Sequence, residues 1–221
     1  TLIVNDRNSG SVFAQWRQGI DRARGDLLWI AEADDLATPD FLASLAPRFA
    51  ATPSLTMAFV DAAQIDGAGQ RLGDSYAAYC GEYSSLDFRR DFSVSGATFL
   101  TQGLGVRNTV LNVSGVLFRR EALAAALARV GTELERWTIA GDWRLYSELC
   151  RAGGAVHYVA RPLNQHRRHA ASVVGTNALP QHLAEITAMH ELLAHDLHLD
   201  TQITQRQSDY LKSLGAISHS H

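Results

Sequence analysis

The chain has 221 residues and a net charge of -3, so it lacks the basic footprint of a nucleic-acid-binding protein. Hydrophobic residues make up 46% and charged residues 19%, a balance that lets one large domain or two small ones bury a core. No apolar stretch approaches the roughly 18 residues needed to cross a bilayer. The two cysteines, Cys80 and Cys150, favour a reduced, cytoplasmic protein.

The first residues alternate between strand-like and helix-like patterns. Residues 1–4, "TLIV", form a β-branched run that predicts a buried strand, and residues 5–10 have turn chemistry. Residues 11–25 repeat apolar side chains at helical spacing, and Gly25 is a suitable end for that helix. Residues 26–31, "DLLWIA", are continuously apolar, as expected of a strand that is covered on both faces.

A second helix and a further strand continue this alternation. Thr38 is suited to cap the helix and Pro39 to occupy its first position. Residues 55–66 predict the next strand. The order strand, helix, strand, helix, strand predicts an α/β fold whose sheet is mostly parallel and flanked by helices.

The second half carries two further helices and two strands. Residues 71–112 are rich in aromatic side chains and weak in periodicity, so we expect short helices and loops there. A strand then runs to Phe118, followed by a helix that ends at Gly131. Residues 142–154 predict a helix, and the strand after it is interrupted by Pro162.

The last part of the chain is predicted to be helical. From Pro180 onward, apolar residues recur at helical spacing and form one packing face, for which dimerisation is a second use. We therefore divide the chain into a main domain of residues 1–178 and a helical extension of residues 179–221.

Three acids follow the apolar strand at residues 26–31. Glu32, Asp34 and Asp35 are expected at the edge of the sheet where ligands bind in open α/β folds. Carboxylates held this close raise one another's pKa unless a cation neutralises them, and their hard oxygen ligands suit Mg²⁺ or Mn²⁺. The alternative is that Asp34 and Asp35 are solvated loop acids, with Asp35 helping to cap the next helix.

Four segments in order resemble the family 2 glycosyltransferases of the GT-A fold. The first is "NSGSVFAQWRQGIDRARGDLLWIAEADDLATPDFLASL", which contains the three acids and begins at Asn8. The others are "NVSGVLFRREAL", "AGDWRLYSELCRAGG" and "PLNQHRRHAASV", the last ending at Val173. The resemblance implies a GT-A fold, which is Rossmann-like, with a C-terminal helical extension added to it.

The resemblance also implies roles for the acids. Asp34 and Asp35 would hold a divalent cation, Mg²⁺ or Mn²⁺, together with the diphosphate or ribose of a nucleotide-sugar. Glu32 stands where the family usually has Asp, and we include it with the metal-binding residues. Asp142 would be the general base that deprotonates the acceptor hydroxyl, although an Asp at the start of a helix can also be a simple N-cap.

The closing basic motif would lie near the diphosphate. It contains Arg167, Arg168 and His169, and guanidinium groups suit phosphate because they can bind it in a bidentate manner. The family's first βαβ segment, with the acid that reads the nucleotide base, is expected to lie upstream of Thr1. This chain by itself is therefore expected to hold an incomplete nucleotide pocket and to be inactive alone.

Together these features predict an inverting glycosyltransferase that moves a sugar from a nucleotide-diphosphate donor to a hydroxyl of a glycan or lipid-linked glycan. The family suggests surface polysaccharide synthesis in the cytoplasm, at the inner face of the membrane, with peripheral membrane association. Two alternatives remain from other classes. One is a metal-dependent phosphohydrolase or nucleotidyltransferase that uses the same acids, and the other is a glycan-binding module without catalysis.

Overall fold

The structure is a computed structural model that describes residues 2–168, 179–197 and 199–217. Its helices are α1 (Val12–Arg22), α2 (Phe41–Ala51), α3 (Ala77–Tyr83), α4 (Gly96–Thr98), α5 (Arg120–Val130), α6 (Gly141–Arg151), α7 (Leu179–Asp196) and α8 (Thr201–Ile217). Its strands are β1 (Leu27–Trp29), β2 (Leu36–Ala37), β3 (Leu55–Ile65), β4 (Arg71–Gly73), β5 (Phe92–Ser95), β6 (Val116–Arg119) and β7 (Ala155–Arg167).

Within the described residues, seven strands form one mixed sheet. The main order is β1-β6-β3-β7-β2, with β4 paired to β3 and β5 paired to β7. The long strands β3 and β7 run parallel at the centre, whereas the other pairings between described strands are antiparallel. The prediction of an α/β fold with flanking helices is confirmed, but the prediction of a mostly parallel sheet is wrong. An apolar run marks a buried strand without encoding its direction, and the short turn between β3 and β4 permits only an antiparallel pair.

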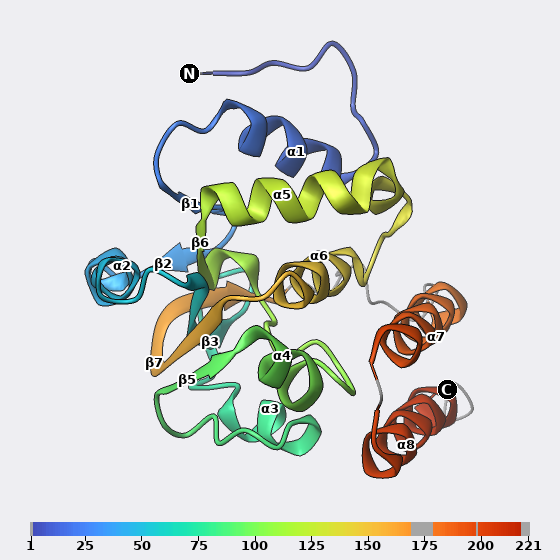
Figure 1. The fold of residues 1–221 in the computed structure, drawn as a ribbon. Coiled ribbons are helices and arrows are strands. Elements are labelled where there is room, and N and C mark those ends of the chain that lie inside the picture. Colours follow the sequence, from blue (N-terminus) through green and yellow to red (C-terminus); the bar gives the residue numbers. More distant parts are fainter. Residues whose placement is uncertain (1, 169–178, 198, 218–221) are drawn as a thin grey trace.

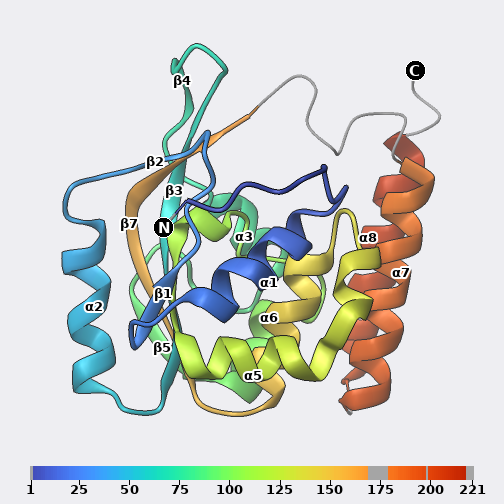
Figure 2. The same cartoon turned by 90° about the horizontal axis from the view of Figure 1, so that it is seen from above.

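Helices cover both faces of this sheet (Figures 1 and 2). Helix α2 packs on one face over a small core that includes Phe41, Leu45 and Leu163. Helices α1, α5 and α6 cover the other face over a larger core, which also takes up buried side chains of α7 and α8. The sheet therefore lies between two helical layers, and the C-terminal helices share the larger core.

Several elements form where the local patterns predict them. Helix α6 buries Trp143 and Tyr146 on one face, as the apolar spacing indicates. Helix α5 ends at Gly131, whose φ of 66° is the left-handed conformation that favours glycine. Strand β3 is almost continuously buried, which agrees with its long apolar sequence.

Three local predictions are wrong. Residues 2–4 form no strand, and Leu2 is 88% exposed, because β1 is the edge strand and no described strand pairs with its outer edge. Helix α2 begins at Phe41 instead of Pro39, and its N-cap is Asp40 instead of Thr38; the Thr38 hydroxyl donates to the Asp40 carboxylate (2.8 Å). Pro162 does not interrupt β7, since the strand absorbs it at a register shift against β3.

The C-terminal helices pack against the main domain instead of standing apart from it. Ile186 and Leu193 of α7, with Tyr210 of α8, are buried in the larger core. The division of the chain at residue 178 stays a prediction, because that boundary lies outside the described residues.

Candidate active site

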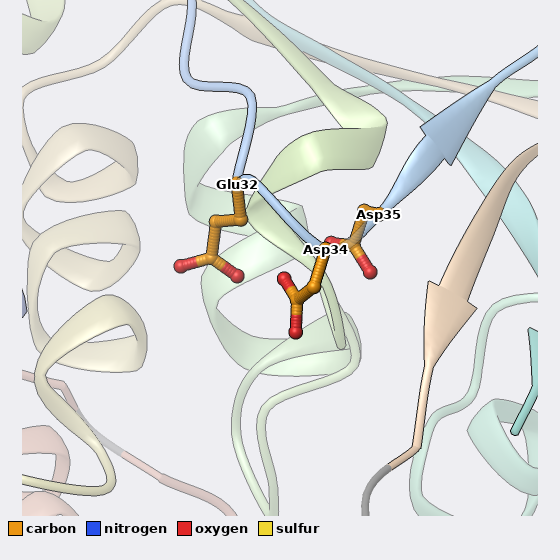
Figure 3. A group of neighbouring side chains, drawn as sticks. All are labelled: Glu32, Asp34 and Asp35. Atoms are coloured by element: carbon orange, nitrogen blue, oxygen red, sulfur yellow. The ribbon is translucent and has the colours of Figure 1, made fainter. Parts of the chain in front are cut away.

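The three predicted acids lie together in the loop between β1 and β2 (Figure 3). One carboxylate oxygen from each of Glu32, Asp34 and Asp35 lies within 4.8 Å of the others. The loop is anchored at its start, because the Glu32 backbone N–H donates to the Ser114 hydroxyl (3.0 Å) and the Trp29 indole N–H donates to the Ser114 carbonyl (2.8 Å). The β6 side of the sheet thus sets where the acids project.

Arg167 anchors the far end of the same loop. Its backbone N–H donates to Asp35 Oδ1 (2.9 Å), and its guanidinium donates to the carbonyls of Asp34 (2.7 Å) and Asp66 (2.7 Å). These contacts tie the acidic loop to β7 and to the turn between β3 and β4. Arg167 therefore positions the loop, and its predicted contact with a phosphate stays a prediction.

The electrostatics of the loop favour a cation. Burial raises the pKa of Glu32 to about 7, with further contributions from the charges of Asp35 and Asp34. Asp35 Oδ2 is buried and has no hydrogen-bond partner within the described part of the chain. Three hard oxygen donors, one of them without a partner, fit a divalent cation such as Mg²⁺ or Mn²⁺.

Asp142 lies in the first turn of α6 and is held at both carboxylate oxygens. The backbone N–H of Trp143 donates to Oδ1 (2.7 Å), and the Asn108 side-chain amide donates to Oδ2 (2.9 Å). Burial, with a smaller contribution from the charge of Glu32, raises the pKa of Asp142 to about 7. The structure therefore brings Asp142 close to the acidic loop, although more than a hundred residues separate them in the sequence.

A pocket of about 350 Å³ opens beside Asp142. It lies between the main domain and the C-terminal helices, and its walls are Gln64, Tyr76, Tyr79, Arg107, Asn108, Leu111, Ile139, Ala140, Asp142, Trp143, Arg168, His182, Ile186 and Tyr210. Aromatic and apolar faces with a few polar groups are typical of ligand pockets. Arg168 of the predicted basic motif lies in this wall, whereas His169 lies outside the described residues.

Helix α7 fixes the segment that leads into Asp142. The Glu185 carboxylate accepts hydrogen bonds from the backbone N–H groups of Thr138 (2.9 Å), Ile139 (2.9 Å) and Ala140 (2.8 Å). These three N–H groups lie just before α6 and have no hydrogen-bond partner within the helix. A residue of the predicted extension thus positions the start of the helix that carries Asp142.

Sequence reasoning missed several of these residues. Asn108, Arg107 and Glu185 sit in segments without a motif, and no local signal marks them. The aromatic-rich middle of the chain was a partial signal, since Tyr76 and Tyr79 line the pocket. Other aromatic residues of that segment, such as Phe99, are instead buried in the core.

Comparison with known proteins identifies the family. No described helix is long and apolar enough to cross a membrane. No curated protein matched the chain. The model of the family described as "Glycosyltransferase like family 2" matches residues 1–187, which include the acidic loop, Asp142 and the first turns of α7. The chain therefore belongs to the family 2-like glycosyltransferases.

Proposed function

We propose that this glycosyltransferase moves a sugar from a nucleotide-diphosphate donor to a hydroxyl of a glycan acceptor, with inversion at the anomeric carbon. The observation that supports this reaction best is that Asp142 lines the pocket of about 350 Å³ and is near enough to Glu32 for the charge of Glu32 to raise the Asp142 pKa. The Asp142 carboxylate thus lines the pocket proposed for the acceptor and lies near the acids that suit a cation and a diphosphate.

Asp142 is the general base of the proposed reaction. It takes the proton of the acceptor hydroxyl, the hydroxyl oxygen forms a bond to the anomeric carbon, and the bond from that carbon to the diphosphate breaks with its electron pair. A base with a pKa of about 7 is matched to neutral pH. The hydrogen bonds from Asn108 and Trp143 fix the orientation of its carboxylate, which lines the pocket.

The acidic loop supplies the donor side. Glu32, Asp34 and Asp35 would hold Mg²⁺ or Mn²⁺, and the bound ion would supply Lewis-acid charge that stabilises the departing diphosphate. Arg167 keeps the loop in place through two main-chain carbonyls. Arg168 faces the same pocket as Asp142 and is available to the negative charge that develops there. The biological setting that we propose is surface polysaccharide assembly.

A binding and activity experiment tests this proposal. Mn²⁺ is titrated by calorimetry with and without UDP or GDP, on the natural chain and on the double variant Asp34→Ala/Asp35→Ala. We expect binding that strengthens with the nucleotide and is lost in the double variant. Asp74→Ala is the matched control, because the Asp74 side chain is 88% exposed in its ion pair.

Asp142→Asn separates the reaction classes. In the transferase this variant keeps binding of Mn²⁺ and nucleotide, but sugar transfer to an acceptor falls by about 10²-fold or more. A metal-dependent phosphohydrolase that uses the same acids would keep its rate in Asp142→Asn. A glycan-binding module would show no metal-dependent nucleotide binding either in this chain or in a chain extended upstream, and that outcome would contradict the proposal.

A further inference from the structure

Arg107 stands out among the residues of the pocket beside Asp142. Its guanidinium lies over three aromatic rings, with distances to the ring centroids of 4.3 Å for Tyr79, 5.1 Å for Tyr83 and 5.1 Å for Tyr210. Tyr79 and Tyr83 belong to α3, and Tyr210 belongs to α8. These rings stabilise and orient a cation by contact with their faces, but they do not use up its N–H donors as an acid would.

No acid compensates this charge. Within the described residues, no carboxylate or carbonyl oxygen accepts a hydrogen bond from the Arg107 side chain. Other partly buried arginines have such partners, as Arg17 does with Glu135 (2.9 Å) and Arg144 does with Glu148 (3.4 Å). Burial lowers the pKa of Arg107, yet a guanidinium stays charged at neutral pH. A half-buried charge without a counter-ion is costly unless a ligand supplies one.

Further basic groups line the same pocket. Arg168 follows β7, and its charge lowers the pKa of Arg107. His182 comes from α7, and the charge of Arg107 lowers the pKa of His182. The nearest acids bond to groups other than Arg107, since Glu185 accepts three backbone N–H groups and Asp142 accepts hydrogen bonds from Trp143 and Asn108. This side of the pocket therefore carries the guanidinium charge of Arg107 without an ion-pair partner among the described residues, whereas burial lowers the pKa of His182 and leaves it mostly neutral at pH 7.

The basic side of the pocket is built from different elements than the acidic loop. Arg107 lies in the segment before β6 and is held by α3 and α8, whereas the acids come from the loop between β1 and β2. Asp142 lines the same pocket as Arg107, and the charge of Glu32 raises the pKa of Asp142. Asp142 thus lies between a region suited to a cation and a region suited to an anion.

We propose that Arg107, together with His182, forms a subsite for an anionic group, a carboxylate or phosphate, that the acceptor carries near the hydroxyl presented to Asp142. This inference rests on the proposed function, because it names the acceptor class of the same site. The planar guanidinium can bind either anion in a bidentate manner. Acidic glycans and phosphate-bearing glycans are then the acceptors that the pocket selects.

Binding of small probes tests the subsite without any turnover. Methyl β-glucuronide, inorganic phosphate and uncharged methyl β-glucoside are titrated into the protein, and affinities are taken from NMR chemical shifts. We expect the anionic probes to bind at least tenfold more tightly than the glucoside. Arg107→Met should weaken binding of the anionic probes about tenfold or more, because it removes the charged hydrogen-bond donor. Arg107→Lys should lie in between.

Arg206→Met is the matched control. Arg206 also joins α8 to α3, because its guanidinium donates to the Glu82 carbonyl (2.9 Å), but it does not line the pocket. Its substitution should leave the affinities for all three probes unchanged. If Arg107→Met fails to fold, Arg107→Lys and the preference of the natural chain for glucuronide over glucoside carry the test.

The outcomes separate this inference from the proposed function. Equal affinity of the natural chain for glucuronide, phosphate and glucoside would overturn the anion subsite. If Arg107→Met instead loses only Mg²⁺-UDP binding, Arg107 serves the donor diphosphate and the assignment to the acceptor is wrong. If Arg107-dependent anion binding is present but the chain, extended upstream or not, never binds a metal-nucleotide complex, the proposed function fails while the subsite stands.

Discussion

Removing the Glu185 carboxylate should destabilise the protein, because it is the hydrogen-bond acceptor for three consecutive backbone N–H groups before α6. A hydrogen bond to a charged group contributes about 1.5–3 kcal/mol when buried. The bond from Thr138 is exposed and the bonds from Ile139 and Ala140 are only partly buried, so water replaces part of what is lost. We expect Glu185→Ala to lower the free energy of unfolding by about 2–3 kcal/mol.

Urea unfolding with linear extrapolation measures this change. In a chain of this size each kcal/mol lowers the melting temperature by about 2–4 °C, so a thermal melt should shift by roughly 5–10 °C. Glu185→Gln keeps one carbonyl oxygen as an acceptor, so its loss of unfolding free energy should be less than half that of Glu185→Ala. Glu191→Ala is the control, because Glu191 is an exposed acid of the same helix. If Glu185→Ala and Glu191→Ala differ by less than about 0.5 kcal/mol, the three hydrogen bonds do not hold the start of α6.

Two further predictions concern acids whose pKa departs from the usual value. Glu148 is buried, which raises its pKa, but hydrogen bonds from Arg129 and Arg151 outweigh burial and lower it. The contribution of Glu148 to the free energy of unfolding is therefore present above about pH 4.5 and lost as the pH falls. Glu148→Gln should lower the free energy of unfolding by about 3 kcal/mol at pH 7, and its stability should converge with that of the natural chain in acid. A stability difference that stays constant with pH would contradict this prediction. The raised pKa of Asp142 gives the opposite sign, because its contribution is full below about 4 and lost as pH rises through about 7. Without metal, the urea midpoint of Asp142→Asn should exceed that of the natural chain by more at pH 8 than at pH 5, and equal midpoints at pH 8 would refute the buried-charge argument.

Local sequence patterns were sufficient for most of the helices and for the acidic loop. Helices α5 and α6 and strand β3 follow from apolar periodicity and glycine ends, which are properties of neighbouring residues. The closeness of Glu32, Asp34 and Asp35 follows from their spacing on one short loop. The four motifs in order were also sufficient to indicate the family, which the family model then showed over residues 1–187.

Only the tertiary structure decided how distant segments meet. Strand direction depends on which segments pair, so the antiparallel entry of β6 beside β1 had no local signal. The approach of Asp142 to Glu32 and the ring contacts of Arg107 join segments far apart in the chain. Glu185 reads as an ordinary surface acid of an amphipathic helix until α7 is packed beside the start of α6. Contacts of this kind arise because burial of apolar faces sets how elements dock, and docking then determines which polar groups meet.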